Sequence, residues 1–385
     1  MRYLLLFLLI LSSCSDIGVT SFSLTPTWEG ATSGQYPDGG FTKIILYKPV
    51  TAGDKTYNHH ARITNKFGRT IVMFSTHHTD EEGIGMWVRY TYDNGDYQFI
   101  SPTQLFKRQD IVLPRLNNFG RVIIPMGFAL DDAGNLYAVG DVCDRDYRNG
   151  ANIRIGIGII ARQINPDMTL GGPFWITGEV EPRPGQDAYS YDPLTGQQLI
   201  NYMSLPGNRS PWGNGFPENH YLHNDYTDGT NREVEVSEVQ GYDAILRYWR
   251  YDPETKPIES QRFKHFQYSL DGVNWQPEQM PFIETPIPDS YSLSKVLRKD
   301  STFFFIGNNQ SPNRNPLFLA TSNDGLNWGN VVNVANAIKV TQRFPGHGKG
   351  GGFQYPDAIY TNQLLIVCSV RKEDIVLFRY TIEEL

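Results

Sequence analysis

The sequence has few cysteines, no excess of basic charge and no long helical pattern, and each absence excludes a class of protein. Three cysteines occur in 385 residues, and setting Cys14 apart leaves Cys143 and Cys368, too few for a disulfide framework. We expect these two to be buried thiols. The formal net charge of -7 and the lack of a basic stripe exclude a general nucleic-acid-binding protein.

A long uninterrupted apolar run occurs at the N-terminus alone. It extends over residues 3–11, follows one arginine and precedes small residues that end at Cys14. This run is too short to span a bilayer and is typical of a secretory signal, and Leu-Ser-Ser-Cys at 11–14 resembles a bacterial lipobox. We therefore expect residues 1–14 to be a signal peptide with a lipobox, the alternative being an ordinary cleaved signal. The protein would be exported and attached by a lipid on Cys14 at the outer membrane, the cell surface or in the periplasm.

The remaining composition favours β-structure. Aromatic residues make up 13% of the chain, 36 glycines and 24 prolines supply turns, and no stretch keeps helical periodicity over three turns. After a polar linker at 15–40, short strand-like runs such as RTIVMFST (69–76) recur to the end. The sequence thus predicts one all-β domain over residues 41–385, built of hairpins.

Two segments repeat each other, YSLDGVNWQP and TSNDGLNWGN, with Asp271 and Asp324 separated by 53 residues. They resemble the Asp-box of sialidase-like β-propellers, in which the Asp caps a turn, the Gly takes a positive φ and the Trp is buried between blades. About 50 residues per four-stranded blade predicts a seven-bladed propeller, or six blades because 180–230 is irregular. That aromatic-rich region is either a functional loop or a degraded blade.

Four of the eight histidines form two adjacent pairs, His59/His60 and His77/His78. Equivalent members lie 18 residues apart, about a strand, a turn and a second strand, so both pairs are expected at the same end of one hairpin. Neighbouring side chains on a strand point to opposite faces, so one histidine of each pair would face a common site. The alternative is that each histidine is a structural residue.

Other candidates come from strand ends elsewhere in the chain. Tyr147 lies in the charged loop DVCDRDYRNG, and Arg162 ends the run IGIGIIARQI. Lys349 and Tyr355 lie in FPGHGKGGGFQYPDAI, whose glycines permit close approach of a ligand. Arg162 has a structural alternative, an ion pair with an acid of the 144–146 loop, and Tyr147 could pack within its loop.

Three acids follow the second histidine pair, Asp80, Glu81 and Glu82. They are compatible with a structural metal ion, but no His/Cys spacing indicates a catalytic zinc. We expect no cofactor for catalysis.

The segments YNHHARI, STHHTDEEGIGMWVRY, IIARQI with GGPFWI, and KGGGFQYPDAI resemble a group of seven-bladed propeller enzymes over most of residues 40–385. The group comprises polysaccharide lyases of the ulvan lyase type and related α-L-rhamnosidases. The resemblance implies two histidines, a tyrosine and an arginine as catalytic residues, and by position these are His60, His78, Tyr147 and Arg162. It leaves His59, His77, Lys349 and Tyr355 as substrate-binding candidates.

The resemblance further implies cleavage of a uronate-containing, ulvan-like polysaccharide by β-elimination. An arginine suits the planar uronate carboxylate, and the enolate-like charge needs nearby donors. The rhamnosidases share the first histidine alone, so the pair His77/His78 favours the lyase. The alternatives are an α-L-rhamnosidase acting on rhamnose linked to glucuronic acid, and a non-catalytic glycan-binding propeller. The expected partner is an anionic polysaccharide or oligosaccharide, and the protein is expected to be a monomer.

Overall fold

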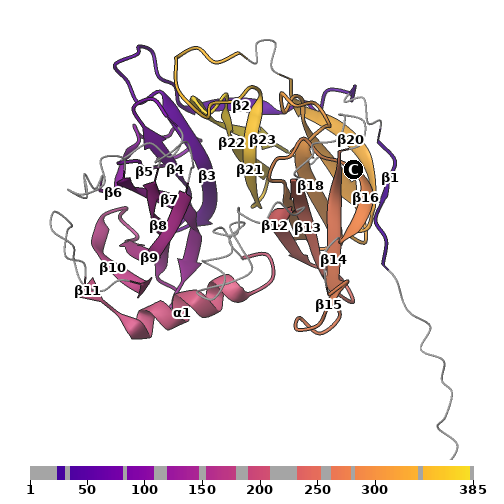
Figure 1. Cartoon of the computed structure of the whole chain (residues 1–385), viewed down its shortest axis with the longest axis horizontal. Coiled ribbons are helices and arrows are strands. Elements are labelled where there is room, and N and C mark those ends of the chain that lie inside the picture. The colour runs from indigo at the N-terminus through magenta and orange to yellow at the C-terminus, as the bar shows by residue number, and fades with distance from the viewer. Residues whose placement is uncertain are drawn as a thin grey trace, which may run out of the picture.

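The structure of the chain is a computed structural model that describes residues 24–30, 35–80, 85–107, 119–146, 153–178, 190–208, 232–252, 262–278, 282–336 and 341–381. These ranges contain 23 strands and one helix, which confirms the all-β prediction. The strands form five sheets, arranged as blades of a β-propeller (Figure 1). Cys14 lies outside the described residues.

Two sheets follow the chain without interruption. The first has the order β3-β4-β5-β6, with β3 (Tyr57–Lys66), β4 (Arg69–His77), β5 (Trp87–Tyr92) and β6 (Thr103–Phe106). The second has the order β7-β8-β9-β10-β11, with β7 (Phe119–Leu130), β8 (Leu136–Asp146), β9 (Ile153–Ile164), β10 (Leu170–Gly178) and β11 (Ser190–Tyr191).

The third sheet has the order β12-β13-β14-β15, with β16 also paired to β14. Its strands are β12 (Arg232–Gln240), β13 (Ile245–Asp252), β14 (Phe263–Ser269), β15 (Trp275–Gln276) and β16 (Ile283–Pro288). The fourth sheet has the order β17-β18-β19-β20-β1, with β17 (Lys295–Lys299), β18 (Thr302–Asn308), β19 (Leu317–Ser322), β20 (Asn327–Ala335) and β1 (Thr27–Trp28).

The fifth sheet joins the two ends of the described chain. It contains β21 (Phe353–Tyr360), β22 (Leu364–Val370), β23 (Asp374–Tyr380) and β2 (Thr42–Tyr47). The early strand β2 pairs antiparallel with the late strand β23, and β1 adds in parallel to β20. Strand β1 lies within the predicted 15–40 linker, so part of that segment is built into the edge of the propeller.

The predicted seven blades are not confirmed, because the described residues form five sheets. The prediction took the 53-residue spacing of the two repeated boxes as the size of every blade. The second sheet departs from this spacing: β7, β8 and β9 are 12, 11 and 12 residues long, and the sheet extends to residue 191.

Strands β3, β7, β12, β17 and β21 each stand at one end of their sheet and line the propeller axis. Strand β3 contacts β7 and β21, and β17 contacts β12 and β21. A cavity of about 630 Å³ on the axis is lined by residues of all five inner strands. Helix α1 (Pro193–Ser204) packs on β7 and β10, and the turn that follows it, 206–208, also lines this cavity.

The repeated boxes form the turns that the sequence predicts. The Asp271 carboxylate accepts the N–H groups of Val273 (2.8 Å) and Asn274 (2.7 Å), and Asp324 accepts the equivalent N–H groups of residues 326 and 327 at 2.8 and 2.7 Å. The glycines after them, Gly272 and Gly325, have φ values of 77° and 78°, a region that favours glycine. The predicted turn chemistry is confirmed.

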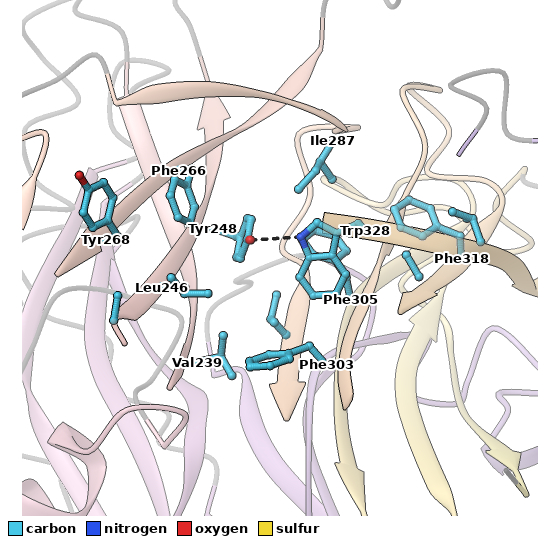
Figure 2. Close-up of a cluster of buried hydrophobic side chains, with 14 of the residues drawn as sticks. Val239, Leu246, Tyr248, Phe266, Tyr268, Ile287, Phe303, Phe305, Phe318 and Trp328 are labelled. Atoms are coloured by element: carbon cyan, nitrogen blue, oxygen red, sulfur yellow. Dashed lines mark hydrogen bonds between the residues drawn. The ribbon is translucent and has the colours of Figure 1, made fainter. Parts of the chain in front are cut away.

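The tryptophan of the second box packs between two blades, also as predicted. Trp328 of β20 is fully buried, and its Nε1 donates a hydrogen bond of 3.1 Å to the hydroxyl of Tyr248 on β13 in the neighbouring sheet (Figure 2). Phe305 of β18 meets the indole edge-on at 5.3 Å. This buried aromatic contact holds the third and fourth sheets together.

Candidate functional site

The two histidine pairs lie at the same end of one hairpin, as predicted. Strands β3 and β4 are antiparallel, and their register places Tyr57 opposite His77 and His59 opposite Ser75. Both pairs therefore lie where β3 begins and β4 ends. The environments differ, because His59 and His60 are buried while His77 is half-buried and His78 is exposed.

The first pair does not alternate, which corrects the prediction that one histidine of a pair faces the site. The register of β3 and β4 shifts between residues 59 and 62, and His60 has a left-handed φ of 53°. This bulge breaks the period of two, so the rings of His59 and His60 lie side by side with centroids 4.2 Å apart. Both imidazoles contribute to the same cluster.

Hydrogen bonds to serines orient both rings. The Nδ1 of His59 lies 2.7 Å from the hydroxyl of Ser369, and the Nδ1 of His60 lies 2.8 Å from the hydroxyl of Ser75. Because Ser75 donates its proton to the carbonyl of His59 (3.1 Å), it must accept from His60. Neutral His60 thus carries its proton on Nδ1 and offers Nε2 as a base. The Nε2 of His59 is buried without a hydrogen-bond partner among the described residues.

Tyr355 of the neighbouring inner strand completes the cluster. Its ring centroid lies 4.5 Å from that of His59 and 5.8 Å from that of His60. Arg250, near the end of β13, donates from Nη1 to the Tyr355 hydroxyl at 2.8 Å. The Arg314 guanidinium lies 5.5 Å from the centre of the Tyr355 ring. Three different sheets and the β18–β19 loop therefore converge at this point.

The cluster is electrostatically positive. Burial holds the pKa of His59 well below its ordinary value, and the charges of His60, Lys372, Arg314 and Arg62 lower it further. His59 is therefore neutral at physiological pH although several cations surround it. Such a site favours an anionic ligand, which would offset the repulsion among these groups.

The second pair makes its described contacts at the turn after β4. The Nδ1 of His77 accepts the N–H groups of Thr79 (3.3 Å) and Asp80 (3.0 Å). His78 lies on the surface, with its two ring nitrogens 3.0 and 2.9 Å from the Nζ of Lys55. These contacts give His77 a turn-capping role and place His78 at the rim rather than within the buried cluster.

Lys349 anchors the glycine-rich loop. Its Nζ donates to the hydroxyl of Thr56 (3.1 Å) and lies 3.7 Å from the buried carboxylate of Glu373, while burial lowers the pKa of its ammonium group. Glu373 also accepts the N–H groups of Arg343 and Phe344, each at 2.8 Å. Lys349 thereby holds the loop against β3 instead of presenting its charge to solvent.

One predicted catalytic residue, Arg162, makes its described contacts away from the cluster, and another, Tyr147, lies outside the described residues. Arg162 lies near the end of β9, and its Nε and Nη1 donate to the carbonyls of Gly171 (2.8 Å) and Leu105 (2.6 Å). Its guanidinium therefore ties two sheets together, and the structure does not bring it to the histidines. Tyr147, like Glu81 and Glu82, lies outside the described residues.

Sequence reasoning missed the two arginines that do converge, Arg250 and Arg314. Arg250 is separated from Tyr355 by 105 residues and Arg314 from Gln354 by 40, and neither stands in a repeated motif. A usable signal was the position of Arg250 at a strand end, since strand ends of different blades meet in a propeller.

Carboxylates close to these strands are already paired. Asp357 accepts the N–H of Ile63 (3.1 Å) and pairs with Lys295 (3.1 Å). Glu373 pairs with Arg343 at 3.2 Å. Within the described ranges, no group of three or more His, Cys, Asp or Glu side chains is placed to hold a metal ion.

Comparison with known proteins identifies the fold. A solved sialidase structure superposes with a TM-score of 0.68 at 19% identity, over 94% of this chain and 34% of the sialidase chain. The chain thus spans about a third of that protein. The Trypanosoma rangeli sialidase in complex with sialic acid gives a TM-score of 0.43 at 9% identity, covering 91% of this chain and 58% of the other.

The catalytic domain of the GH62 α-L-arabinofuranosidase of Coprinopsis cinerea gives a TM-score of 0.41 at 11% identity, covering 89% of this chain and 96% of that domain. No protein-family model and no curated protein sequence matches the chain. At 19% identity the first similarity establishes a sialidase-like propeller fold and nothing finer.

Proposed function

We propose that the protein is a carbohydrate-active enzyme that cleaves a uronate-containing polysaccharide by β-elimination. The observation that carries the proposal is the convergence of His59, His60, Tyr355, Arg250 and Arg314 in one buried, positively charged cluster. The sialidase-like fold supports a role on glycans, because the solved structure that superposes with a TM-score of 0.68 is a sialidase.

The cluster offers the groups that β-elimination needs. The substrate carboxylate would bind between Arg314 and the unpartnered Nε2 of His59, which donates when Nδ1 accepts from Ser369. These contacts would stabilise the enolate-like charge that develops when the α-proton leaves. Preorganised donors of this kind contribute most when water is excluded, and both His59 and Tyr355 are buried.

Tyr355 is assigned as the acid–base residue in place of Tyr147. Arg250 donates to its hydroxyl and would stabilise negative charge on that oxygen. The phenolate would take the proton from the carbon next to the carboxylate, the bond to the leaving glycosidic oxygen would break as the carbon–carbon double bond forms, and the phenol would then protonate that oxygen. The Nε2 of neutral His60 would be a second acceptor for the proton that leaves the substrate carbon. The lyase proposal thus rests on the first histidine pair and no longer on His77/His78.

A hydrolase with two flanking carboxylates finds less support in the described residues. Ordinary glycosidases need one carboxyl group as acid and a second as base or nucleophile. Asp357, two residues after Tyr355, and Glu373, in the turn between β22 and β23, are both engaged in ion pairs. An α-L-rhamnosidase and a non-catalytic glycan-binding propeller remain the competing outcomes of the test.

The test is incubation of the protein with ulvan and other uronate polymers, followed by ultraviolet absorbance and release of free sugars. A lyase produces an unsaturated uronate that absorbs, and we expect Tyr355→Phe to lower kcat by about 100-fold or more. Tyr380→Phe, on β23 and stacked on Phe41, is the matched control and keeps full activity. Free rhamnose without absorbance would favour the hydrolase, and binding without turnover the glycan-binding protein.

We further propose that the protein is exported and lipid-anchored through Cys14, and that it acts as a monomer without a catalytic cofactor. No helix among the described residues has the length and apolar character needed to cross a membrane. Replacing Cys14 with alanine in the producing cell tests the anchor: the variant would move from the membrane fraction to the soluble fraction.

A further inference from the structure

The cavity on the propeller axis is a second candidate site, next to the histidine cluster. Its volume of about 630 Å³ lies in the range of small-molecule sites. Arg62, three residues after His59, and Pro356, which follows Tyr355, both line it. The cavity therefore lies on the axis next to the cluster, toward the C-terminal ends of the inner strands.

An ion pair between neighbouring inner strands supplies charge to this cavity. Lys295 of β17 lies 3.1 Å from Asp357 of β21, and both line the cavity. Asp357 is fixed by the N–H groups of Ile63 (3.1 Å) and Ala358 (3.0 Å). The ion pair uses one of the three N–H donors of the Lys295 ammonium group. The Lys295 side chain is 25% exposed.

A buried hydroxyl beside this pair lacks a partner. Ser294 also lines the cavity and is 3% exposed, and its Oγ has no hydrogen-bond partner among the described residues. Buried polar groups are almost always hydrogen-bonded, so an unpartnered hydroxyl in a cavity wall indicates a polar molecule at that place. Leu293 and Pro356 also line the cavity and add apolar surface suited to the C–H face of a sugar ring.

We propose that the axial cavity binds one uronic acid unit, separately from the histidine cluster. The carboxylate of the sugar would bind the ammonium group of Lys295, and its hydroxyls would bind the Oγ of Ser294 and the carboxylate of Asp357. The carboxylate of Glu238 also lines the cavity but is neutralised by Arg247 at 2.6 Å. One cation, a fixed acceptor and an unpartnered hydroxyl together match a sugar acid better than a neutral sugar or a simple anion. The inference does not depend on cleavage at Tyr355.

The test is titration calorimetry of the full chain with glucuronate and with glucose. We expect glucuronate to bind wild type at least about tenfold more tightly than glucose, and Lys295→Met to weaken glucuronate binding by about tenfold or more. Lys66→Met is the matched control, since it removes a lysine at the end of another inner strand, β3, and neither Lys66 nor an acidic partner of it lines the cavity in the contacts described. Its affinity for glucuronate stays that of wild type.

Two further variants keep the inference falsifiable. Ser294→Leu fills the cavity without removing a charge and abolishes binding, so a misfolded Lys295→Met would not leave the question open. Tyr355→Phe retains glucuronate binding even where it loses turnover. Equal affinities of Lys295→Met and Lys66→Met, loss of binding in Tyr355→Phe, or no glucuronate binding by wild type would each overturn the inference. Lysine-dependent binding without polymer cleavage would overturn the proposed function alone.

Discussion

The neutral state of buried His59 predicts how stability changes between pH 7.5 and pH 5.5. Burial and neighbouring cations such as Lys372, Arg314 and Arg62 hold the folded pKa of His59 well below 6.5, the value expected in the unfolded chain. Below pH 6.5 the unfolded chain therefore binds a proton that the folded protein does not bind, and the free energy of unfolding falls as the pH falls. At pH 5.5 this one group costs on the order of 1 kcal/mol relative to neutral pH.

The assay is chemical denaturation of wild type and His59→Gln at both pH values. Titrating groups that do not contact His59 contribute equally to the two proteins, so wild type should lose on the order of 1 kcal/mol more than His59→Gln on acidification. His78→Gln, which changes an exposed histidine, should lose as much as wild type. Equal losses by wild type and His59→Gln would show that His59 takes up its proton in the folded state, and would refute the buried positive cluster as described.

Two more predictions concern the contacts that hold the propeller together. Trp328→Ala should lower the free energy of unfolding by about 3–5 kcal/mol, because Trp328 is fully buried between two sheets. Trp275→Ala should lower it by about 1 kcal/mol, because the equivalent tryptophan of the first box is half-buried. Equal losses in chemical denaturation would contradict this difference in packing. Glu373→Gln should cost about 3 kcal/mol, because the buried carboxylate balances cations such as Arg371, while the exposed Glu284→Gln should leave the unfolding free energy unchanged in the same assay.

Much of the fold follows from local chemistry visible in the sequence. The repeated boxes predicted their turns because an Asp that accepts N–H groups and a Gly with positive φ are local requirements, independent of the rest of the chain. The blade count was not predictable in the same way. The number of blades depends on strand lengths throughout the chain. Strands β7 to β9 are longer than the box spacing implies, and the 53-residue repeat carries no information about their lengths.

The candidate site was predicted in part. The hairpin spacing placed both histidine pairs at one end, and Tyr355 was selected for its glycine-rich surroundings. Arg250 and Arg314 were missed, since their partners are distant in sequence and are brought close by the closure of the propeller. Arg162 was selected for its strand-end position, but its donors bind the carbonyls of Gly171 on β10 and of Leu105 on β6 in another sheet.

A backbone feature distinguishes the first histidine pair, on which the proposed site depends, from the second. His60 and Tyr355 have left-handed φ values of 53° and 50°, and each stands where an inner strand shifts register against its neighbour. A non-glycine residue in this region costs on the order of 1 kcal/mol or more, and sheet pairing does not require it. The two bulges interrupt the regular alternation of side chains and bring the rings of His60 and Tyr355 close to each other, beside His59. Strain at matching positions on adjacent inner strands is expected where ring placement matters to function, and the turn-capping pair His77/His78 has no such feature among its described angles.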